Sequence, residues 1–502
     1  MSSKRALLLK GASWLALARI AINLLAFAST LILARLLVPE DFGLVAIAEA
    51  FAIILVSITE LSLAQALIRH DNPEEHHFHT AWTLNFARSV GLAAIMAGLS
   101  FPAAAIYGDP RLAPVLLVLA GGTLLGGLEN PKLIVFQRKL VFWQEFVLSV
   151  GAKVAAFVVA IGIAVAFRSY WALILGGIAG GLARVALSYV LIPYRPRFGL
   201  SAYRDLLSFS IWLTFAQAIE VINKRSVPIA IGLVVSTASL GQYAMGVRLA
   251  QMPVREGISP VRKMFFPAFA SIKNDIARLR AAYLRAQESL CTLAFPIAGG
   301  LTALAEPAVR ILIGEKWLPA VPIIQVISLA AALEVMESTS ALAMAVDRTK
   351  ALFERNLRAF LIRIPLILLG GWLGSLTLVG IVMGVVYGRS LASVINMIWN
   401  MQLVRDAIGL RVRRQLAVGL RPAIATGAMM VALLVPLSLF PITKGGVESA
   451  FKLIGLVAFG AATYIAMLAV VWLAAGQPEG PEAEALRLGT RLPQRLRRQG
   501  AD

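Results

Sequence analysis

Fourteen apolar stretches determine what this chain of 502 residues can fold into. Each is long enough to cross a hydrocarbon core of about 30 Å as a helix, and short polar breaks separate one from the next. We therefore predict an all-α, polytopic membrane protein with about 14 transmembrane helices. The predicted spans are residues 12–36, 43–68, 79–106, 112–136, 142–167, 170–192, 207–234, 241–268, 284–312, 320–346, 355–377, 379–403, 419–440 and 450–475.

The composition favours this fold class, because 59% of the residues are hydrophobic and 15% are charged. Soluble domains are about 45–50% apolar and about 25% charged. The N-terminal segment leads into the first span without an A-x-A-like cleavage site, which predicts an uncleaved first helix rather than a signal peptide. Cys291 is the single cysteine of the chain, so an intrachain disulfide is excluded.

The positions of the 47 Lys and Arg residues predict the orientation of the chain. With both termini in the cytoplasm, most of them fall in inner loops, in the termini or at inner helix ends. This bias follows the positive-inside rule and favours an even number of spans. The basic residues on the outer side are Arg35, Arg111, Arg168, Lys316, Lys444 and Lys452.

A weak internal echo suggests how the spans are grouped. Phe42-Gly43 at the start of the second span matches Leu240-Gly241 at the start of the eighth. Internal repeats are common in transporters, with the substrate site between the halves. The tail mixes Pro, Gly, Glu and Arg, so we expect it to be disordered. The predicted parts are a six-helix lobe over 1–192, a cytoplasmic loop over 193–206, a second six-helix lobe over 207–405, a helix pair over 406–476 and a basic cytoplasmic tail over 477–502.

Charge is concentrated in the seventh and eighth spans. The seventh carries Lys224 and Arg225 near its middle, and the eighth places Arg248, Arg255 and Arg262 seven residues apart. This spacing drifts by only about 20° per step on a helix, so it predicts a single row of guanidinium groups. An arginine at mid-bilayer costs about 2.5–3.5 kcal/mol, and the row must therefore face water, a protein partner or an anionic ligand.

Cations outnumber acids within the spans, which predicts a hydrated cavity of positive potential. Such a cavity suits an anionic substrate, above all a pyrophosphate, because arginine offers it bidentate hydrogen bonds. Arg262 is close enough to the inner surface to snorkel and is set apart from the cavity. For each remaining cation a structural ion pair is an equal alternative. The candidate substrate-binding residues are Arg19, Arg88, Arg248, Arg255, Lys224, Arg225 and Arg389.

Three acidic residues within spans are candidates for coupling transport to a proton or sodium gradient, namely Glu49, Glu60 and Glu220. A carboxylate in a medium of low dielectric can titrate near neutral pH, as ion coupling requires. Pro253 and Pro260 interrupt the eighth span, where they are either gating hinges or static kinks.

All four histidines, His70, His76, His77 and His79, lie in one predicted inner loop. Their spacing matches no defined metal motif, so we predict a solvated turn and no metal site. The chain carries no G-x-S-x-G elbow, Walker loop or H-E-x-x-H motif. We therefore predict a protein without catalytic residues or a cofactor.

Several segments together resemble the bacterial oligosaccharide flippases of polysaccharide export, which belong to the multidrug/oligosaccharidyl-lipid/polysaccharide superfamily. The similarity covers about residues 10–405 and is carried by ILARLLVPEDFGLVAIAEAF, AAAIYGDPRLAPVL, IGLVVSTASLGQYAMGVRLAQMP and ILIGEKWLPAVPIIQ, in the expected order. The resemblance implies a bacterial inner-membrane protein that moves a polyprenyl-pyrophosphate-linked oligosaccharide outward by alternating access. It also implies partnership with glycosyltransferases and a polysaccharide polymerase. The family often has an acidic residue near Asn223, where Lys224 and Arg225 follow here.

Three alternatives remain at this point. A multidrug or cation antiporter of the same superfamily is disfavoured, because an arginine-lined cavity repels cationic drugs. A lipid II flippase fits the same features. A membrane glycan polymerase usually presents a sizeable outer loop, and the predicted outer loops here are short.

Overall fold

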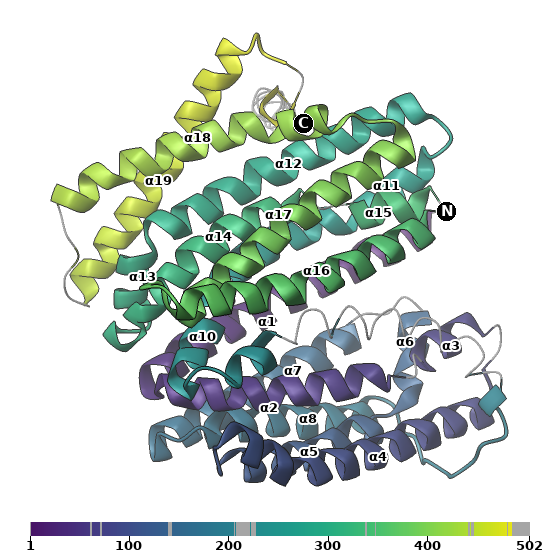
Figure 1. Cartoon of the computed structure of the whole chain (residues 1–502). Helices are drawn as coiled ribbons and strands as arrows, with labels where there is room; N and C mark the ends of the chain where they lie inside the picture. The colour runs from purple at the N-terminus through teal and green to yellow at the C-terminus, as the bar shows by residue number, and fades with distance from the viewer. Residues whose placement is uncertain are drawn as a thin grey trace, which may run out of the picture. The chain divides into compact units, whose positions relative to one another are not determined.

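The computed structural model of the chain (Figure 1) describes residues 2–60, 63–70, 73–138, 143–204, 206, 221, 227–336, 339–346, 348–439, 442, 446–478 and 480–483. Within these ranges the regular structure consists of α-helices and two short 3-10 helices, and no strand is present. The all-α fold class predicted from the apolar stretches is confirmed.

The first of two compact units covers Met1–Ala244. Within it α4 packs along α5, α7 packs along α8, and α1 packs along α7. Its helices are α1 (Ser2–Leu36), α2 (Pro39–Ile58), α3 (Leu63–Arg69), α4 (Glu75–Tyr107), α5 (Leu112–Leu128), the 3-10 helix η1 (Pro131–Leu133), α6 (Ile134–Arg138), α7 (Trp143–Phe167), α8 (Trp171–Leu191) and the start of α10 (Thr237–Lys263).

The second unit covers Met245–Asp502. Here α16 packs along α17, α12 packs along both α14 and α18, and α18 packs along α19. Its helices are the rest of α10, α11 (Phe265–Ser271), α12 (Ile276–Ala303), α13 (Ala305–Leu312), the 3-10 helix η2 (Glu315–Ala320), α14 (Val321–Val335), α15 (Thr339–Ala345), α16 (Thr349–Ser375), α17 (Gly380–Ile408), α18 (Val412–Leu439) and α19 (Val447–Ala474). The boundary between these two units lies inside α10. The predicted division into two six-helix lobes, a connecting loop at 193–206, a helix pair and a tail stays a prediction.

Ten helices among the described residues are long and apolar enough to cross a membrane, or eleven when the bent pair α12–α13 is taken as one span. Of the other predicted spans, the fourth appears as α5, a shorter apolar helix of 17 residues. The eighth appears as α10, which is not among the helices apolar enough to cross a membrane. The seventh falls largely outside the described residues. A polytopic membrane protein is confirmed, and the number fourteen stays a prediction.

Two details of the predicted spans are wrong. The ninth, 284–312, was expected to be one continuous helix, but the chain bends by 72° between α12 and α13. Pro296 lies within α12 without ending it, so the bend follows a local break at Leu304. The second, 43–68, divides into α2 and α3. In contrast, α10 continues through both Pro253 and Pro260, so neither proline ends the helix.

The beginnings of α2 and α10 meet through their backbones. A Cβ atom on Gly43 would lie 1.8 Å from the carbonyl oxygen of Thr237, and one on Gly241 would lie 1.8 Å from that of Pro39. The contact is reciprocal, because each glycine faces the residue four positions before the other. Small residues permit such close helix crossings in membranes. The two glycines of the predicted internal echo therefore form one contact inside the first unit.

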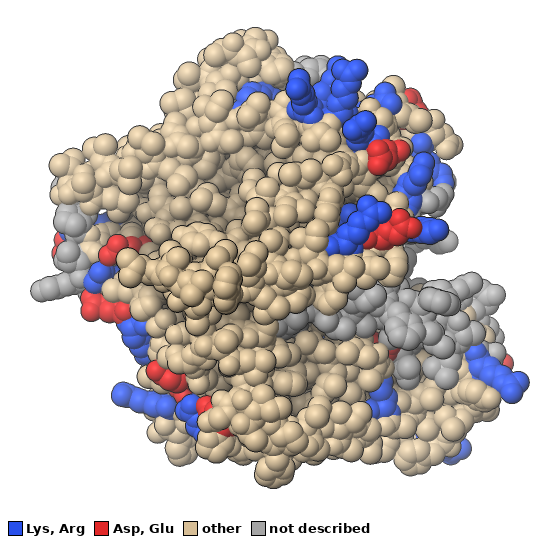
Figure 2. All heavy atoms as spheres, in the orientation of Figure 1, with Lys and Arg blue, Asp and Glu red and all other residues tan. Residues whose placement is uncertain are grey.

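On one face of the protein (Figure 2), the middle stretches of the long helices carry few charged residues. On the face drawn in Figure 2, Lys, Arg, Asp and Glu gather toward the ends of the long helices, and the stretches between them present uncharged atoms. Large apolar side chains are exposed inside the long helices, for example Val431 and Leu434 on α18 and Ile465 on α19. Exposed apolar surface on this scale fits a lipid environment.

Candidate functional site

The predicted row of arginines is present on one face of α10. Arg248, Arg255 and Arg262 all have exposed side chains. From the other side of the helix, Ala250 and Val254 are 0% and 2% exposed. Packing therefore fixes the rotation of α10 about its axis and leaves the guanidinium groups directed away from the buried face.

This face is unsuited to lipid. The three arginines span fourteen residues, which at 1.5 Å per residue is about 21 Å, most of the thickness of a hydrocarbon core. Exposing Arg248 and Arg255 to acyl chains would cost about 2.5–3.5 kcal/mol each. A face of this kind is stable in a membrane when it borders water, a protein partner or an anionic ligand. Arginine is the side chain best suited to bind phosphate oxygens in pairs.

Arg88 and Glu60 lie close together in the first unit. Nη1 of Arg88, on α4, donates a hydrogen bond of 3.4 Å to the carbonyl oxygen of Val56, and the carboxylate of Glu60 acts on Arg88 electrostatically. Val56 belongs to the last turn of α2, which ends at Ile58. Cations stabilise the C-terminal end of a helix, where carbonyl groups lack intrahelical partners. Arg88 thus has a structural contact beside its predicted role in binding substrate.

The other described candidates lie in different surroundings. Glu49 is exposed on α2 although its neighbours Ala48 and Ala50 are buried, and Glu60 is exposed just after α2. Arg19 is half-buried on α1. Glu220, Lys224 and Arg225 lie outside the described residues, so their predicted roles stay predictions.

Arg389 is only 8% exposed and lies on α17, near a band of half-buried polar side chains in the second unit. One helical turn further, Ser393 donates a hydrogen bond of 3.2 Å to Glu334 of α14. Next along the same face, Asn396 accepts one of 3.0 Å from Arg355 of α16. These contacts join three helices across their packed faces, which favours a structural role for this band.

Some of the charged residues within the predicted spans form ion pairs. Arg184 on α8 binds Glu129 at 2.9 Å and lies 3.8 Å from Glu145 of α7. Ser149, one turn along α7, donates to Glu145 at 2.9 Å. These contacts join α8 to α7 and to the end of α5, which favours a structural role for these charges over a role in binding substrate.

Two of the four histidines, His77 and His79, lie in the first turns of α4 and make specific contacts, unlike residues of a solvated turn. His77 is 4% exposed, and its Nδ1 accepts a hydrogen bond of 3.1 Å from the amide of Glu74 at the start of α4. His79 bonds the hydroxyl of Tyr194 at 2.8 Å, and burial raises the pKa of that hydroxyl well above its usual value. Among the described residues, no group of three or more His, Cys, Asp or Glu side chains could hold a metal ion.

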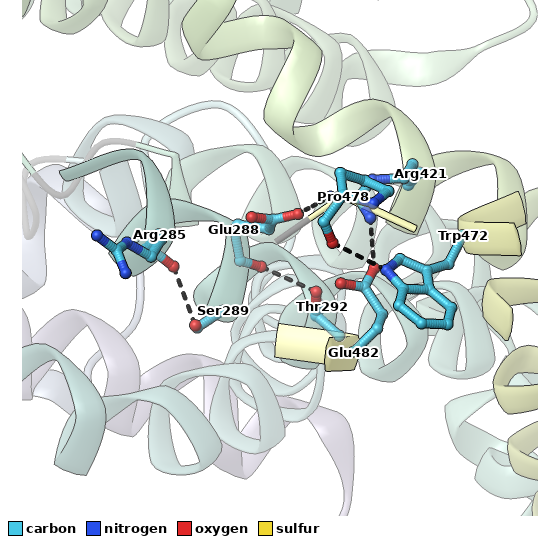
Figure 3. Close-up of polar contacts among 8 residues, drawn as sticks. All are labelled: Arg285, Glu288, Ser289, Thr292, Arg421, Trp472, Pro478 and Glu482. Atoms are coloured by element: carbon cyan, nitrogen blue, oxygen red, sulfur yellow. Dashed lines mark hydrogen bonds and ion pairs between the residues drawn. The ribbon is translucent and has the colours of Figure 1, made fainter. Parts of the chain in front are cut away.

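The sequence did not reveal an ionic cluster at the C-terminal end of α19. Arg421 of α18 binds Glu288 of α12 through Nη2 and Glu482 through Nη1, the latter at 3.2 Å. Figure 3 shows the two carboxylates converging on this guanidinium, with Trp472 beside them. Glu482 belongs to the tail that was expected to be disordered. That expectation is wrong for Gly480 to Ala483, which lie against the helices.

The cluster was hard to foresee, because its members are far apart in the sequence. The one available signal was that Glu288 and Arg421 are opposite charges within apolar helices, which require partners. Nothing in the composition of the tail distinguished Glu482 from the other acidic residues of the tail.

Several known proteins are similar to most of this chain. The profile of a family described as polysaccharide biosynthesis protein matches residues 32–322. The chain is 28% identical over 327 residues to the succinoglycan biosynthesis transport protein ExoT of Rhizobium meliloti. This match spans 64% of this chain and 65% of ExoT, which is just under two thirds of the length of ExoT. It is 25% identical over 403 residues to the lipopolysaccharide biosynthesis protein WzxC of Escherichia coli, spanning 78% of this chain and 79% of WzxC.

Solved structures provide the comparison of fold. The lipid II flippase MurJ, in an inward closed conformation, matches with a TM-score of 0.73 at 14% identity, covering 93% of this chain and 99% of that one. An inward-facing multidrug resistance transporter of the MATE family matches with a TM-score of 0.57 at 14% identity, covering 78% and 98%. At such low identity these matches establish a shared fold and nothing more.

Proposed function

Because this chain belongs to the polysaccharide biosynthesis protein family, we propose that it is a flippase for polyprenyl-pyrophosphate-linked oligosaccharides. It moves a repeat unit of O-antigen, lipopolysaccharide or exopolysaccharide from the inner to the outer leaflet. The relatives support this assignment, since ExoT is named for succinoglycan transport and WzxC for lipopolysaccharide biosynthesis. The protein is a transporter rather than an enzyme and works in the bacterial inner membrane with both termini in the cytoplasm.

The observation that carries this proposal is the exposed arginine face of α10. The pyrophosphate is the charged part of the substrate, and Arg248 and Arg255 supply planar donors that match its oxygens. The sugars enter the hydrated space beside it, and the prenyl chain stays in lipid because its transfer to water is unfavourable. Rocking of the lobes then exposes the headgroup to the outer side, as alternating access requires.

The energy for transport and the delivery of the substrate depend on groups other than the arginines of α10. Glu49, Glu60 and Glu220 are the candidate carriers of a coupling proton or sodium ion. Glu60 is of particular interest, because a change in its charge acts directly on the neighbouring Arg88. Glycosyltransferases deliver the lipid-linked oligosaccharide on the cytoplasmic side, and a polysaccharide polymerase consumes it on the other.

Charge reversal on α10 tests the proposal. Arg248→Glu and Arg255→Glu each remove a charge-assisted contact of about 1.5–3 kcal/mol, and we expect export to fall by at least about tenfold. The assay is surface polysaccharide in a deletion strain that carries each variant, together with the lipid-linked oligosaccharide trapped on the cytoplasmic leaflet. Arg278→Glu is the matched control, because Arg278 is an exposed arginine at the start of α12.

Membrane levels of the variants are measured by immunoblot, so that loss of protein is separated from loss of function. Normal surface polysaccharide in both α10 variants would refute the arginine face as the substrate path. Absence of trapped lipid-linked oligosaccharide in the deletion strain would refute the flippase assignment itself.

Three other functions are distinguished by the Arg255→Glu variant and by the deletion strain. A cation antiporter of this fold would bind cationic drugs better after Arg255→Glu, because the repulsive charge is removed. A lipid II flippase would be required for cell-wall synthesis, so its deletion would stop growth rather than remove surface polysaccharide. A membrane glycan polymerase would change chain length without trapping lipid-linked repeat units.

A further inference from the structure

The chain reverses direction directly after α19. Gly476 and Gln477 both have left-handed backbones, with φ of +80° and +54°. Their amides donate hydrogen bonds of 3.1 Å each to the carbonyls of Leu473 and Trp472 at the end of the helix. A left-handed conformation is unfavourable for a residue with a side chain, so at Gln477 the surrounding contacts must hold it.

The returning segment is fixed at two further points. The indole Nε1 of Trp472, a side chain that is 8% exposed, donates a hydrogen bond of 3.0 Å to the carbonyl oxygen of Pro478. At Gly480 a Cβ atom would lie 2.9 Å from Oε2 of Glu482 and 3.0 Å from Oε1 of Glu288. The segment therefore passes close to both carboxylates, and the absence of a side chain at Gly480 permits this approach.

The charge balance at the end of the segment is unequal. One guanidinium, that of Arg421, serves the carboxylates of both Glu288 and Glu482, and each of these side chains is only 8% exposed. Oε2 of Glu482 is buried and has no hydrogen-bond partner within the described part of the chain. Figure 3 shows Glu288 and Glu482 approaching Arg421 from different elements. Two carboxylates thus compete for one cation.

This competition makes the contact of Glu482 easy to release. Breaking an ordinary buried ion pair is costly, because it leaves one charge buried and unpaired. Here Arg421 keeps Glu288 when Glu482 leaves, so no cation is stranded. Release also returns an unsatisfied carboxylate oxygen to water, which is favourable.

We propose that the described residues 476–478 and 480–483 form a releasable strap, which Glu482 holds closed through its ion pair with Arg421. When closed, the strap ties the end of α19 to α12 and α18. It also lies against Glu288 and Arg421, two of the residues that line a pocket of about 400 Å³ between α12 and α18. When open, it frees the end of α19 from α12 and α18. The ion pair of Glu482 with Arg421 holds the strap closed. Glu288 weakens this pair, because it binds the same guanidinium.

Hydrogen–deuterium exchange of the purified full-length protein tests the strap. In the wild type we expect residues 476–483 to exchange faster than residues 284–292 of α12, because the strap opens while the helices stay packed. Glu482→Ala removes the ion pair that holds the strap closed, and exchange in the strap should rise by about tenfold. Glu288→Gln removes the competitor without changing its shape, and exchange in the strap should fall. The control is Glu448→Ala, which removes an exposed ion pair at the start of α19 and should leave the strap unchanged.

The opposite signs of the two variants distinguish a strap held by this ion pair from passive packing. A tail that is merely packed would be loosened by both substitutions, so faster exchange in Glu288→Gln would overturn the proposal. Equal exchange in the strap and in α12 of the wild type would also overturn it, because the two would then open together. Glu482→Asp and Glu288→Ala are second variants for the same two effects. Size-exclusion profiles matching the wild type confirm that each variant is folded.

Discussion

Gly43→Ala is the sharpest test of how the first unit is packed. The added Cβ atom would lie 1.8 Å from the carbonyl oxygen of Thr237 and 3.1 Å from the amide of Gly241. Both are backbone atoms at the start of a helix, so neither can move aside as a side chain would. Reaching a tolerable contact of about 3.2 Å requires α2 and α10 to separate by about 1.4 Å, which loosens the whole crossing.

We expect this overpacking to lower the free energy of unfolding by about 2–4 kcal/mol. Gly241→Ala should cost a similar amount, because its Cβ atom would meet the carbonyl oxygen of Pro39 at 1.8 Å. The double variant should cost less than the sum, since the first substitution already separates the same two helices. These differences are measured by thermal or denaturant unfolding in detergent.

Gly98→Ala on α4 is the matched control. A Cβ atom there meets nothing within 4 Å, so the substitution should be neutral, or stabilising by up to about 1 kcal/mol through the better helix propensity of alanine. Equal stability of the Gly43→Ala and Gly98→Ala variants would refute the backbone contact between α2 and α10. Full additivity of the two damaging substitutions would refute their sharing of one crossing.

Two further predictions concern the first unit. Asn130 is 1% exposed, and its side-chain amide donates hydrogen bonds of 3.2 and 2.8 Å to the carbonyl oxygens of Ser188 and Ile192. Asn130→Ala should therefore lower the free energy of unfolding by about 2–3 kcal/mol, and a melting temperature equal to that of the wild type would contradict this. The guanidinium of Arg111 holds the pKa of Asp109 below its usual value, so the stability this carboxylate contributes is present above about pH 3.9 and disappears as the pH falls through the lower folded pKa. Asp109→Asn should therefore be less stable than the wild type at pH 7, by less than about 1 kcal/mol because the pair is partly exposed to solvent, and equally stable near pH 2. A difference that persists at pH 2 would exclude the ionic cause.

The sequence determined the class of the protein and the course of most helices. Apolar stretches of about 20 residues or more can satisfy their backbone groups in lipid only within themselves, so their lengths predict helices directly. The predicted spans 142–167, 170–192 and 379–403 correspond closely to α7, α8 and α17. The row of Arg248 and Arg255 was equally accessible, because residues seven apart share a face on any α-helix.

The tertiary structure decided which partners these elements have. The meeting of Gly43 with Gly241, and of Glu288 and Glu482 on Arg421, joins residues that are far apart in the chain. Helical periodicity relates a residue to its own helix alone, and no local pattern specifies which helix packs beside it. Whether a charge in a span is paired, exposed or shared depends on that neighbour. For this reason the sequence by itself established the spans and the arginine row, and the contacts of α10 with α2 and of the tail with α18 followed only from the packed fold.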